Sequence, residues 1–344
     1  KKMVLVGVLP PHSIEASYVA YLAEDPSVLV LTETTSNLHH SKFIPAIDQL
    51  ISSLTEDELS RLQPDVLLTF GGMVISKRIK ALLRKFQPDL HWHIDPKKAY
   101  DTYFSLSYHC KQTPNSFLAL LKEKATIVAS DYQNQWLALR SHRLKRHEAY
   151  LQEIPFSDFQ VFDEIFKALP QGVQLQLANS ATVRYAQLFD LDTSLKVFCN
   201  RGTSGIDGST STAIGAARVS KEQTVFVTGD LSFFYDSNAL WNDYIPASFR
   251  ILLINNSGGG IFRILPDAKN SEQFDTYFET KHTLTAAQLS DMYQFEYVSA
   301  ANKSDLKKQL QHFFEPSERP RLLEVFTPSE VNDEILLAYF NYIT

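Results

Sequence analysis

The sequence predicts an α/β protein built from two doubly wound, parallel-sheet domains. Short apolar runs of strand length alternate along the chain with segments of helical periodicity, which is the pattern of a parallel sheet with crossover helices. In addition, the 344 residues exceed what a single hydrophobic core normally organises, so two domains are expected.

The first domain is expected at residues 1–150. Its predicted strands are 3–8, 28–32, 66–70 and 91–94, and its predicted helices are 16–23, 44–54 and a segment that begins near Lys77. The stretch from Ser130 to Ile154 is polar, rich in Arg, Gln and His, and has no strand signal. We therefore expect a connecting helix there and place the domain boundary within it.

The second domain is expected at residues 151–344. Its predicted strands are 174–177, 196–199, 224–227, 250–254, 296–299 and 321–326. Its predicted helices are 156–169, 181–189, a small-residue helix after Gly208, 237–244, 285–293 and 306–314. This second alternation again predicts a parallel sheet.

Composition excludes several classes of function. A formal net charge of −6 gives no long-range attraction for nucleic acid or an anionic membrane, and no apolar run is long enough to cross a bilayer. Two cysteines, Cys110 and Cys199, are too few for a disulfide framework and lack the spacing of a zinc site, so a cytoplasmic location is expected. The chain does not begin with Met, and we expect it to be part of a longer protein.

Histidines suggest a metal site only weakly. His39 and His40 are adjacent, and His91 and His93 are near one another, but no cysteine or carboxylate spacing accompanies them. Surface or strand histidines are the favoured interpretation.

Polar residues follow two predicted neighbouring strands. Gly229 and Asp230 come after the strand at 224–227, and Asn256 follows the strand at 250–254. A single helical crossover joins these strands, so their carboxyl ends meet at the edge of the sheet where such folds bind ligands. A carboxylate, an amide oxygen and the carbonyl of Gly258 form an oxygen-only set that suits Mg²⁺, with Mn²⁺ as the alternative ion, when phosphate oxygens complete the shell.

The same segments supply backbone N–H groups that can cradle a phosphate. They belong to Leu231, Ser232 and the glycines Gly258 and Gly259. Taken singly, Gly-Asp after a strand is usually a turn with a helix cap, and Asn-Asn before glycines is usually a loop. Their ordered combination favours a phosphorylated cofactor bound with a metal ion at Asp230, Asn256 and Gly258.

Longer motifs resemble one family. Residues 200–208, 229–236 and 255–262 are similar to the 2-succinyl-5-enolpyruvyl-6-hydroxy-3-cyclohexene-1-carboxylate synthases, thiamine-diphosphate enzymes of menaquinone biosynthesis. The resemblance extends to 5–11 and 70–78, so it covers both predicted domains. It implies the central and diphosphate-binding domains of the thiamine-diphosphate enzyme type, and thiamine diphosphate with Mg²⁺ as cofactors.

The resemblance also implies a reaction and a set of substrate-binding residues. The family decarboxylates 2-oxoglutarate and joins the succinyl unit to isochorismate, a carboligation that requires cations for several carboxylates. The implied substrate-binding residues are Lys77, Arg78, Ser180, Arg184 and Arg201. The position of Arg201 after a strand favours this role, whereas the other three cations could be solvated helix charges and Ser180 could be a helix cap.

Apolar cofactor contacts are implied by the same motifs. Ile206 matches the position that supports the bent cofactor, and Ile261 and Phe262 match apolar active-site positions. Ordinary core packing explains all three equally well.

One catalytic element of the family is not found in these residues. Family members use a Glu in an amino-terminal pyrimidine-binding domain, whereas Glu33 follows a strand in what resembles the central domain. We therefore expect no catalytic acid here, an inactive fragment, and a site completed by the protein's own amino-terminal domain and a homodimer or homotetramer partner.

Two alternatives stay open at this point. Another thiamine-diphosphate enzyme, such as a 2-oxo-acid decarboxylase or acetolactate synthase, would have an apolar pocket in place of the cations. A non-catalytic nucleotide-binding or assembly module is disfavoured because the first strand is followed by Gly7-Val8-Leu9-Pro10-Pro11, which supplies no Gly-x-Gly-x-x-Gly turn.

Overall fold

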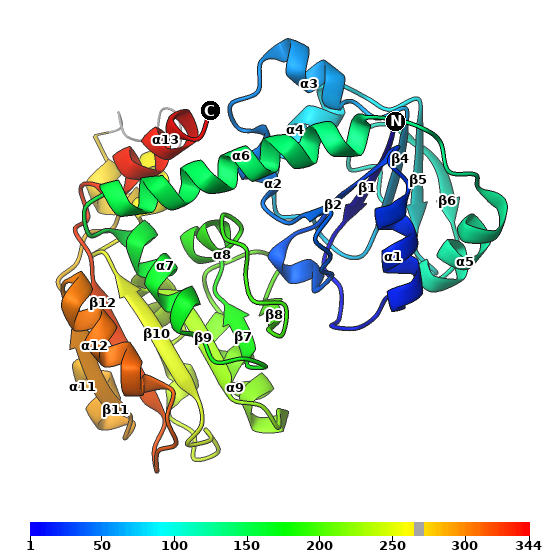
Figure 1. Cartoon of the computed structure of the whole chain (residues 1–344). Coiled ribbons are helices and arrows are strands. Elements are labelled where there is room, and N and C mark those ends of the chain that lie inside the picture. The colour runs from blue at the N-terminus through cyan, green and yellow to red at the C-terminus, as the bar shows by residue number, and fades with distance from the viewer. Residues whose placement is uncertain (265–271) are drawn as a thin grey trace. The chain divides into compact units, whose positions relative to one another are not determined.

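A computed structural model describes residues 1–264 and 272–344 and divides the chain into two compact units (Figure 1). Unit 1 comprises Lys1–Glu148 with Phe340–Thr344, and unit 2 comprises Ala149–Tyr339. Each unit contains a six-stranded sheet, and the strand pairs within the described residues are parallel. The predicted fold class, two doubly wound parallel-sheet domains, is confirmed.

The sheet of unit 1 has the strand order β3-β2-β1-β4-β5-β6. Its strands are β1 (Lys2–Val6), β2 (Val28–Leu31), β3 (Phe43–Ile44), β4 (Val66–Phe70), β5 (Leu90–Ile94) and β6 (Leu106–Cys110). Side chains alternate across the sheet, so Met3 and Leu5 enter one core cluster and Val4 and Val6 enter another.

Both faces of this sheet are covered by helices (Figure 1). Residues of α2 (Ile47–Ile51), α3 (Glu56–Leu62) and α4 (Lys77–Lys85) join the cluster of Met3, whereas residues of α1 (Ala16–Glu24) and α5 (Pro114–Lys124) join the cluster of Val4. A short 3₁₀ helix, η1 (Thr34–Ser36), follows β2.

Three elements of unit 1 escape the sequence patterns. Strand β6 lies at the edge of the sheet, and its central residues are exposed, so its sequence shows no apolar alternation. Helices α3 and α5 were also not predicted. The helix expected at 44–54 is shorter, because Phe43–Ile44 pairs with β2 before the chain turns.

The sheet of unit 2 has the strand order β11-β12-β10-β9-β7-β8. Its strands are β7 (Gln174–Leu177), β8 (Lys196–Cys199), β9 (Thr224–Gly229), β10 (Arg250–Asn255), β11 (Glu296–Ala300) and β12 (Arg321–Phe326). Its α-helices are α7 (Asp158–Ala168), α8 (Ala181–Ala186), α9 (Ser209–Val219), α10 (Asp230–Tyr235), α11 (Ala287–Met292), α12 (Lys303–Phe313) and most of α13 (Asn332–Tyr342), which ends in unit 1.

Helices α9 and α10 contribute to a core cluster with Phe226, Ile251 and Leu253 of the sheet. A second set of aromatic contacts includes Phe159 of α7, whose ring centroid lies 5.5 Å from that of Tyr185 in α8 and 4.8 Å from that of Tyr339 in α13. Aromatic side chains therefore hold α7, α8 and α13 against one another.

The helix predicted at 237–244 is wrong in extent. Only the 3₁₀ helix η2 (Ser237–Leu240) forms, and the side chain of Asn242 donates a hydrogen bond of 2.6 Å to Ala239 O, which ends it. The α-helix of this connection, α10, begins earlier, directly after β9, and places Asp230 in its first turn.

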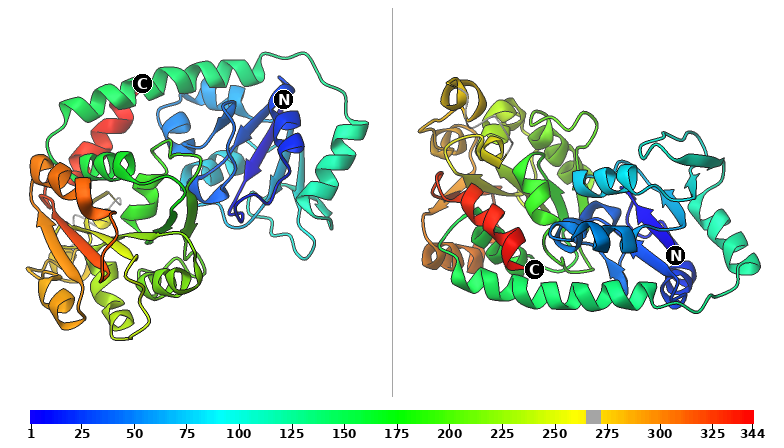
Figure 2. Two further views of the ribbon diagram at one scale, coloured as in Figure 1. Left: turned by 60° about the horizontal axis from the view of Figure 1, so that its bottom comes forward. Right: turned by 90° about the horizontal axis from the view of Figure 1, so that it is seen from above.

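The expected connecting helix is α6 (Tyr132–Glu153), 22 residues long and continuous (Figure 2). The division between the two units falls within it. No helix in the described ranges combines the length and apolarity needed to span a membrane.

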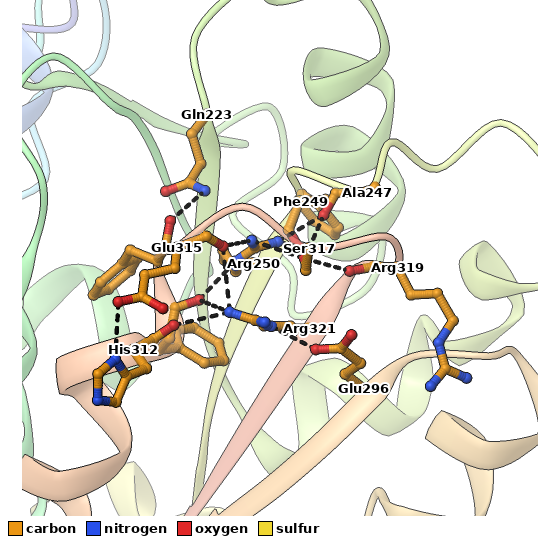
Figure 3. Close-up of polar contacts among 12 residues, drawn as sticks. Gln223, Ala247, Phe249, Arg250, Glu296, His312, Glu315, Ser317, Arg319 and Arg321 are labelled. Atoms are coloured by element: carbon orange, nitrogen blue, oxygen red, sulfur yellow. Dashed lines mark hydrogen bonds and ion pairs between the residues drawn. The ribbon is translucent and has the colours of Figure 1, made fainter.

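A buried arginine closes the amino ends of β10 and β12 (Figure 3). Arg250 donates through Nε to Phe313 O at 2.7 Å, through Nη1 to Ala247 O at 2.7 Å and through Nη2 to Glu315 O at 2.5 Å. Arg250 thereby supplies hydrogen-bond donors to carbonyls at the end of α12. A guanidinium group can cap a helix in this way because it carries several N–H donors in a fixed geometry. Burial lowers the pKa of Arg250 to about 10, and nearby Arg321 acts in the same direction.

Candidate functional site

The carboxyl edge of the unit 2 sheet contains a topological switch point. From β7 the chain crosses to β8 on one side, and from β9 it crosses to β10 on the other. Loops that leave in opposite directions open a crevice between the ends of β7 and β9, where doubly wound folds bind ligands. Asn179 and Ser180 follow β7 at this point, and Asp230 follows β9.

Asp230 ties the ends of β9 and β10 together. Its carboxylate is buried, with 3% of the residue exposed. Oδ2 accepts a hydrogen bond of 3.0 Å from the backbone N–H of Gly258, and Oδ1 accepts one of 2.7 Å from that of Leu231. Two of the three expected metal-binding residues therefore lie side by side.

Gly258 occupies a position that excludes a side chain. Its φ is +153°, and a Cβ there would lie 2.6 Å from the carbonyl oxygen of Glu279. The next N–H, of Gly259, donates to that same oxygen at 2.6 Å. The loop after β10 is thus held by its backbone close to Asp230, as a cofactor-binding loop requires.

Asn256 meets a carboxylate that the sequence did not indicate. Its Nδ2 donates to Asp158 Oδ2 at 2.8 Å, and Thr327 Oγ1 donates to Asp158 Oδ1 at 2.6 Å. Burial raises the pKa of Asp158 to about 6, and the negative charge of Asp230 acts in the same direction. Two buried carboxylates therefore lie within electrostatic reach of each other beside Asn256.

A histidine also approaches Asp230. His282 Nε2 lies 3.2 Å from Asp230 Oδ2, without the alignment of a hydrogen bond, and the backbone N–H of His282 donates to Ser257 O at 3.2 Å. The loop at Ser257 and the segment at His282 are thus joined next to the carboxylate.

The structure describes the side chains of two of the three expected apolar cofactor-binding residues, Ile206 and Phe262. Ser232 Oγ donates a hydrogen bond of 2.6 Å to Ile206 O, so the loop after β8 is joined to α10, and Ile206 is half-buried. Phe262 is half-buried in η3 (Gly260–Ile264), and its ring centroid lies 5.8 Å from that of Phe278 in the π-helix η5 (Phe274–Phe278). The side chain of Ile261 lies outside the described part of the structure.

Arg184 and Arg201 gather near the switch point. Arg201 Nη1 donates to Asn179 Oδ1 at 2.8 Å, and Arg184 Nη1 donates to Ser180 O at 2.6 Å. Burial raises the pKa of Cys199 to about 12, although both guanidinium groups act to lower it. Arg201 Nε is buried, and it has no hydrogen-bond partner among the residues that the structure describes.

Three serines at this edge adopt positive φ angles. They are Ser180 after β7 (65°), Ser204 after β8 (62°) and Ser257 after β10 (64°). Such backbone is costly for residues with a side chain and concentrates at functional sites. Ser180 is the residue before α8, yet its side chain makes no capping hydrogen bond, so a helix cap does not explain it.

Lys77 and Arg78 lie in unit 1, at the start of α4. Both are exposed, and among the described residues neither pairs with an acidic side chain; Arg78 lies over the ring of Phe340, 4.6 Å from its centroid. Cations at a helix N-terminus oppose the helix dipole, so helix stability does not account for them.

Buried Glu33 holds the turn before these cations. Its carboxylate accepts the backbone N–H of Ile75 at 2.7 Å and that of Ser76 at 2.8 Å. Burial raises the pKa of Glu33 to about 7, against the lowering effect of these two hydrogen bonds. Glu33 is therefore a structural acid of this unit.

Unit 1 also has a topological switch point, between β1 and β4. The backbones of the two loops that leave these strands are in contact there. Gly7 N donates to Phe70 O at 2.9 Å and Gly72 N donates to Val8 O at 2.8 Å. A Cβ at Gly7 would lie 1.9 Å from Gly72 O. No room is left between these two loops for a diphosphate, which argues against the nucleotide-binding alternative for this unit.

Family models decide the identity of both units. A model described as the middle domain of thiamine pyrophosphate matches residues 1–177, and one described as the C-terminal TPP binding domain of thiamine pyrophosphate enzymes matches residues 179–325. The chain belongs to the thiamine pyrophosphate enzymes. The carboxyl-terminal family match contains Asp230, Asn256 and Gly258.

Individual thiamine pyrophosphate enzymes align along the whole chain. Relatives named 2-succinyl-5-enolpyruvyl-6-hydroxy-3-cyclohexene-1-carboxylate synthase are 52% identical in Christiangramia forsetii, 51% identical in Flavobacterium johnsoniae and 34% identical in Porphyromonas gingivalis. They align with 100%, 100% and 99% of this chain, which covers 60%, 62% and 61% of their lengths. The resemblance seen in the motifs is confirmed, and the chain spans about three fifths of these relatives.

The donor chemistry of this thiamine pyrophosphate enzyme fits Mg²⁺. Within residues 1–264 and 272–344, no group of three His, Cys, Asp or Glu side chains is arranged to hold a metal ion. The candidate set instead combines one carboxylate, one amide oxygen and a backbone carbonyl, which leaves positions for phosphate and water oxygens.

Sequence reasoning missed three polar residues of this site. Asn179 stands directly after a strand at the switch point, so the rule that selected Asp230 could have found it. Asp158 looks like an ordinary acid in the first turn of a helix, and His282 follows no strand. Local sequence gave no signal for those two.

Proposed function

We propose that this chain is the central and carboxyl-terminal part of a thiamine-diphosphate- and Mg²⁺-dependent synthase that decarboxylates 2-oxoglutarate and adds the succinyl unit to isochorismate in menaquinone biosynthesis. The hydrogen bond between the Asp230 carboxylate and the N–H of Gly258 carries the proposal, because it unites the two strand ends that bear the metal motif. The names of the relatives support the choice of reaction.

Asp230, Asn256 and the Gly258 carbonyl would hold Mg²⁺. The N–H of Leu231, which donates to Asp230 Oδ1, would keep that carboxylate in place, and the N–H of Ser232 would face the diphosphate. When bound, thiamine diphosphate supplies the electron sink that decarboxylation needs. Ile206 would support the cofactor from the loop after β8, which Ser232 fixes.

Substrate carboxylates require cations. Arg184 stands beside the switch point, and Arg201 follows the next strand, β8. The Nε of Arg201, buried and without a partner among the described residues, supports binding of an anion there. Ser180 would add a hydroxyl donor, and Lys77 and Arg78 are proposed as further carboxylate-binding residues from unit 1. This cationic set favours dicarboxylate chemistry over the apolar pocket of an acetolactate synthase or a simple 2-oxo-acid decarboxylase.

Calorimetric titration of thiamine diphosphate with Mg²⁺ into the full-length protein tests the metal site. We expect the Asp230→Ala variant to bind at least about 100-fold more weakly, because a buried metal-binding carboxylate is lost. Asp243→Ala, at an exposed position of unit 2, is the control. Equal binding by wild type and Asp230→Ala would remove the assignment.

Activity is tested separately, with 2-oxoglutarate and isochorismate as substrates. The full-length protein should release CO₂ and form the carboligation product, whereas the 344 residues alone should be inactive, because the family's catalytic Glu and the partner subunit complete the site. Carboligation by the 344 residues alone would contradict this part of the proposal.

A further inference from the structure

Asp158 connects three separate segments of unit 2. Its carboxylate accepts hydrogen bonds from Asn256 after β10 and from Thr327 after β12, and its own backbone N–H donates to Asn332 Oδ1 at 2.9 Å. The residue is 3% exposed, and both of its carboxylate oxygens are occupied. Hydrogen bonds therefore hold both the backbone and the carboxylate of Asp158 in place.

The carboxylate of Asp158 determines the orientation of the Asn256 side-chain amide. An amide side chain carries an acceptor oxygen and a donor NH₂ of nearly equal size, so a half-turn costs little unless its partners differ. An ionised carboxylate only accepts, so Asp158 holds the NH₂ group. The Oδ1 of Asn256 is thereby turned away from Asp158.

We propose that Asp158 is a positioning residue that selects the metal-binding orientation of Asn256, with Thr327 holding Asp158 in place. The inference rests on the proposed function, because it requires Asn256 to be a metal ligand. Outer partners of this kind orient the groups that touch a metal and tune its affinity.

The charges around Asp158 support this role. The carboxylate of Asp230 acts electrostatically on that of Asp158, and both are almost entirely buried. Two like charges in a buried place are unfavourable without a cation near them. A divalent cation bound at Asp230 would offset both charges.

Titration of Mg²⁺ into the full-length protein at saturating thiamine diphosphate tests the inference, together with the melting temperature of the metal-free protein. We expect Asp158→Asn to weaken Mg²⁺ binding by about 10–100-fold, because either end of Asn256 can then face the new amide. A residue with only a structural role would lower the melting temperature and leave the Mg²⁺ affinity of the folded protein unchanged.

Asp163→Asn is the matched control. Asp163 lies on the same helix, is 4% exposed and accepts a hydrogen bond from Lys167 at 2.6 Å, remote from Asn256 in its contacts. We expect wild-type Mg²⁺ affinity for it.

A double variant tests orientation directly. In Asp158→Asn with Asn256→Asp, donor and acceptor exchange places, the hydrogen bond is restored and a carboxylate oxygen faces the metal. We expect the double variant to bind Mg²⁺ about tenfold more tightly than Asp158→Asn alone.

If Asp158→Asn fails to fold, Thr327→Val is the substitute variant for the Mg²⁺ titration. It removes only the hydrogen bond from Thr327 to one carboxylate oxygen of Asp158, so it should perturb the fold less. Wild-type Mg²⁺ affinity in folded Asp158→Asn, or in Thr327→Val when that substitute is needed, would overturn the inference. If Asp230→Ala also binds Mg²⁺ like wild type, the proposed function itself has failed, so the two failures are distinguishable.

Discussion

The Oδ1 atom of Asn179, which follows β7, accepts a hydrogen bond of 2.8 Å from Arg201 Nη1, which follows the neighbouring strand β8. The Nδ2 of the same side chain donates to Asn200 O at 2.6 Å and to Gly205 O at 2.8 Å. One buried amide therefore fixes both the loop after β8 and the guanidinium that we propose for substrate binding.

Loss of this amide should impair substrate binding before it impairs cofactor binding. We expect Asn179→Ala to raise the KM for 2-oxoglutarate or isochorismate by about tenfold or more, because a hydrogen bond to a charged group contributes about 1.5–3 kcal/mol. Steady-state kinetics of the full-length protein checks this. Asn242→Ala, which removes hydrogen bonds only to the nearby backbone of Ala239 and Tyr244, should leave KM unchanged. An unchanged KM in Asn179→Ala would contradict the role.

Ser180 should show a conflict between stability and function. Its φ of 65° and ψ of −125° are unfavourable for any residue with a Cβ, so Ser180→Gly should raise the free energy of unfolding by about 1 kcal/mol. The lost hydroxyl should at the same time raise KM. Ser220→Gly, at a φ of −72°, should give no gain in stability. Urea unfolding and kinetics of the same samples measure both effects, and a destabilised Ser180→Gly would argue against backbone strain.

Two buried groups of unit 1 should give opposite pH dependences. The pKa of Glu33 is raised from 4.5 to about 7 by burial, so between these values the native state keeps a proton that the unfolded chain has lost, and stability falls as pH rises. The pKa of His91 is lowered from 6.5 to about 4, chiefly by burial, so between these values the unfolded chain binds the extra proton and stability rises with pH.

The two contributions, each up to about 3 kcal/mol, oppose each other between pH 4.5 and 6.5 in the wild type. Relative to the wild type, Glu33→Gln should therefore make the slope of stability against pH more positive, and His91→Asn should make it more negative. Urea unfolding at several pH values in this window measures the slopes. Identical slopes in wild type and both variants would refute the two assignments.

Arg250 should be irreplaceable by lysine. Its guanidinium donates to three carbonyls from two segments, and an ammonium cannot reach them all, so Arg250→Lys should lower the free energy of unfolding by about 3 kcal/mol (Figure 3). Arg319→Lys is the matched control, because that side chain is exposed and only its carbonyl joins the cluster. Similar unfolding midpoints for the two variants would contradict the capping role.

The sequence by itself determined the layered fold and the core of the site. Short, continuous apolar runs separated by helices specify parallel strands, and the carboxyl ends of neighbouring parallel strands meet at one edge whatever the details of packing. That is why Asp230 and Gly258, which are 28 positions apart, could be expected together, and the structure joins them by a hydrogen bond. Edge strand β6 escaped because an exposed strand has no buried face to impose a pattern.

Only the tertiary structure decided how the side chains are held. Asp158 reaches Asn256 across 98 positions, and a first-turn acid on a helix carries no local mark of such a partner. The same is true of His282 beside Asp230 and of Glu33 beneath the turn at Ser76. Local periodicity records which face of an element is buried, whereas the partner of a buried polar group is chosen by topology and packing.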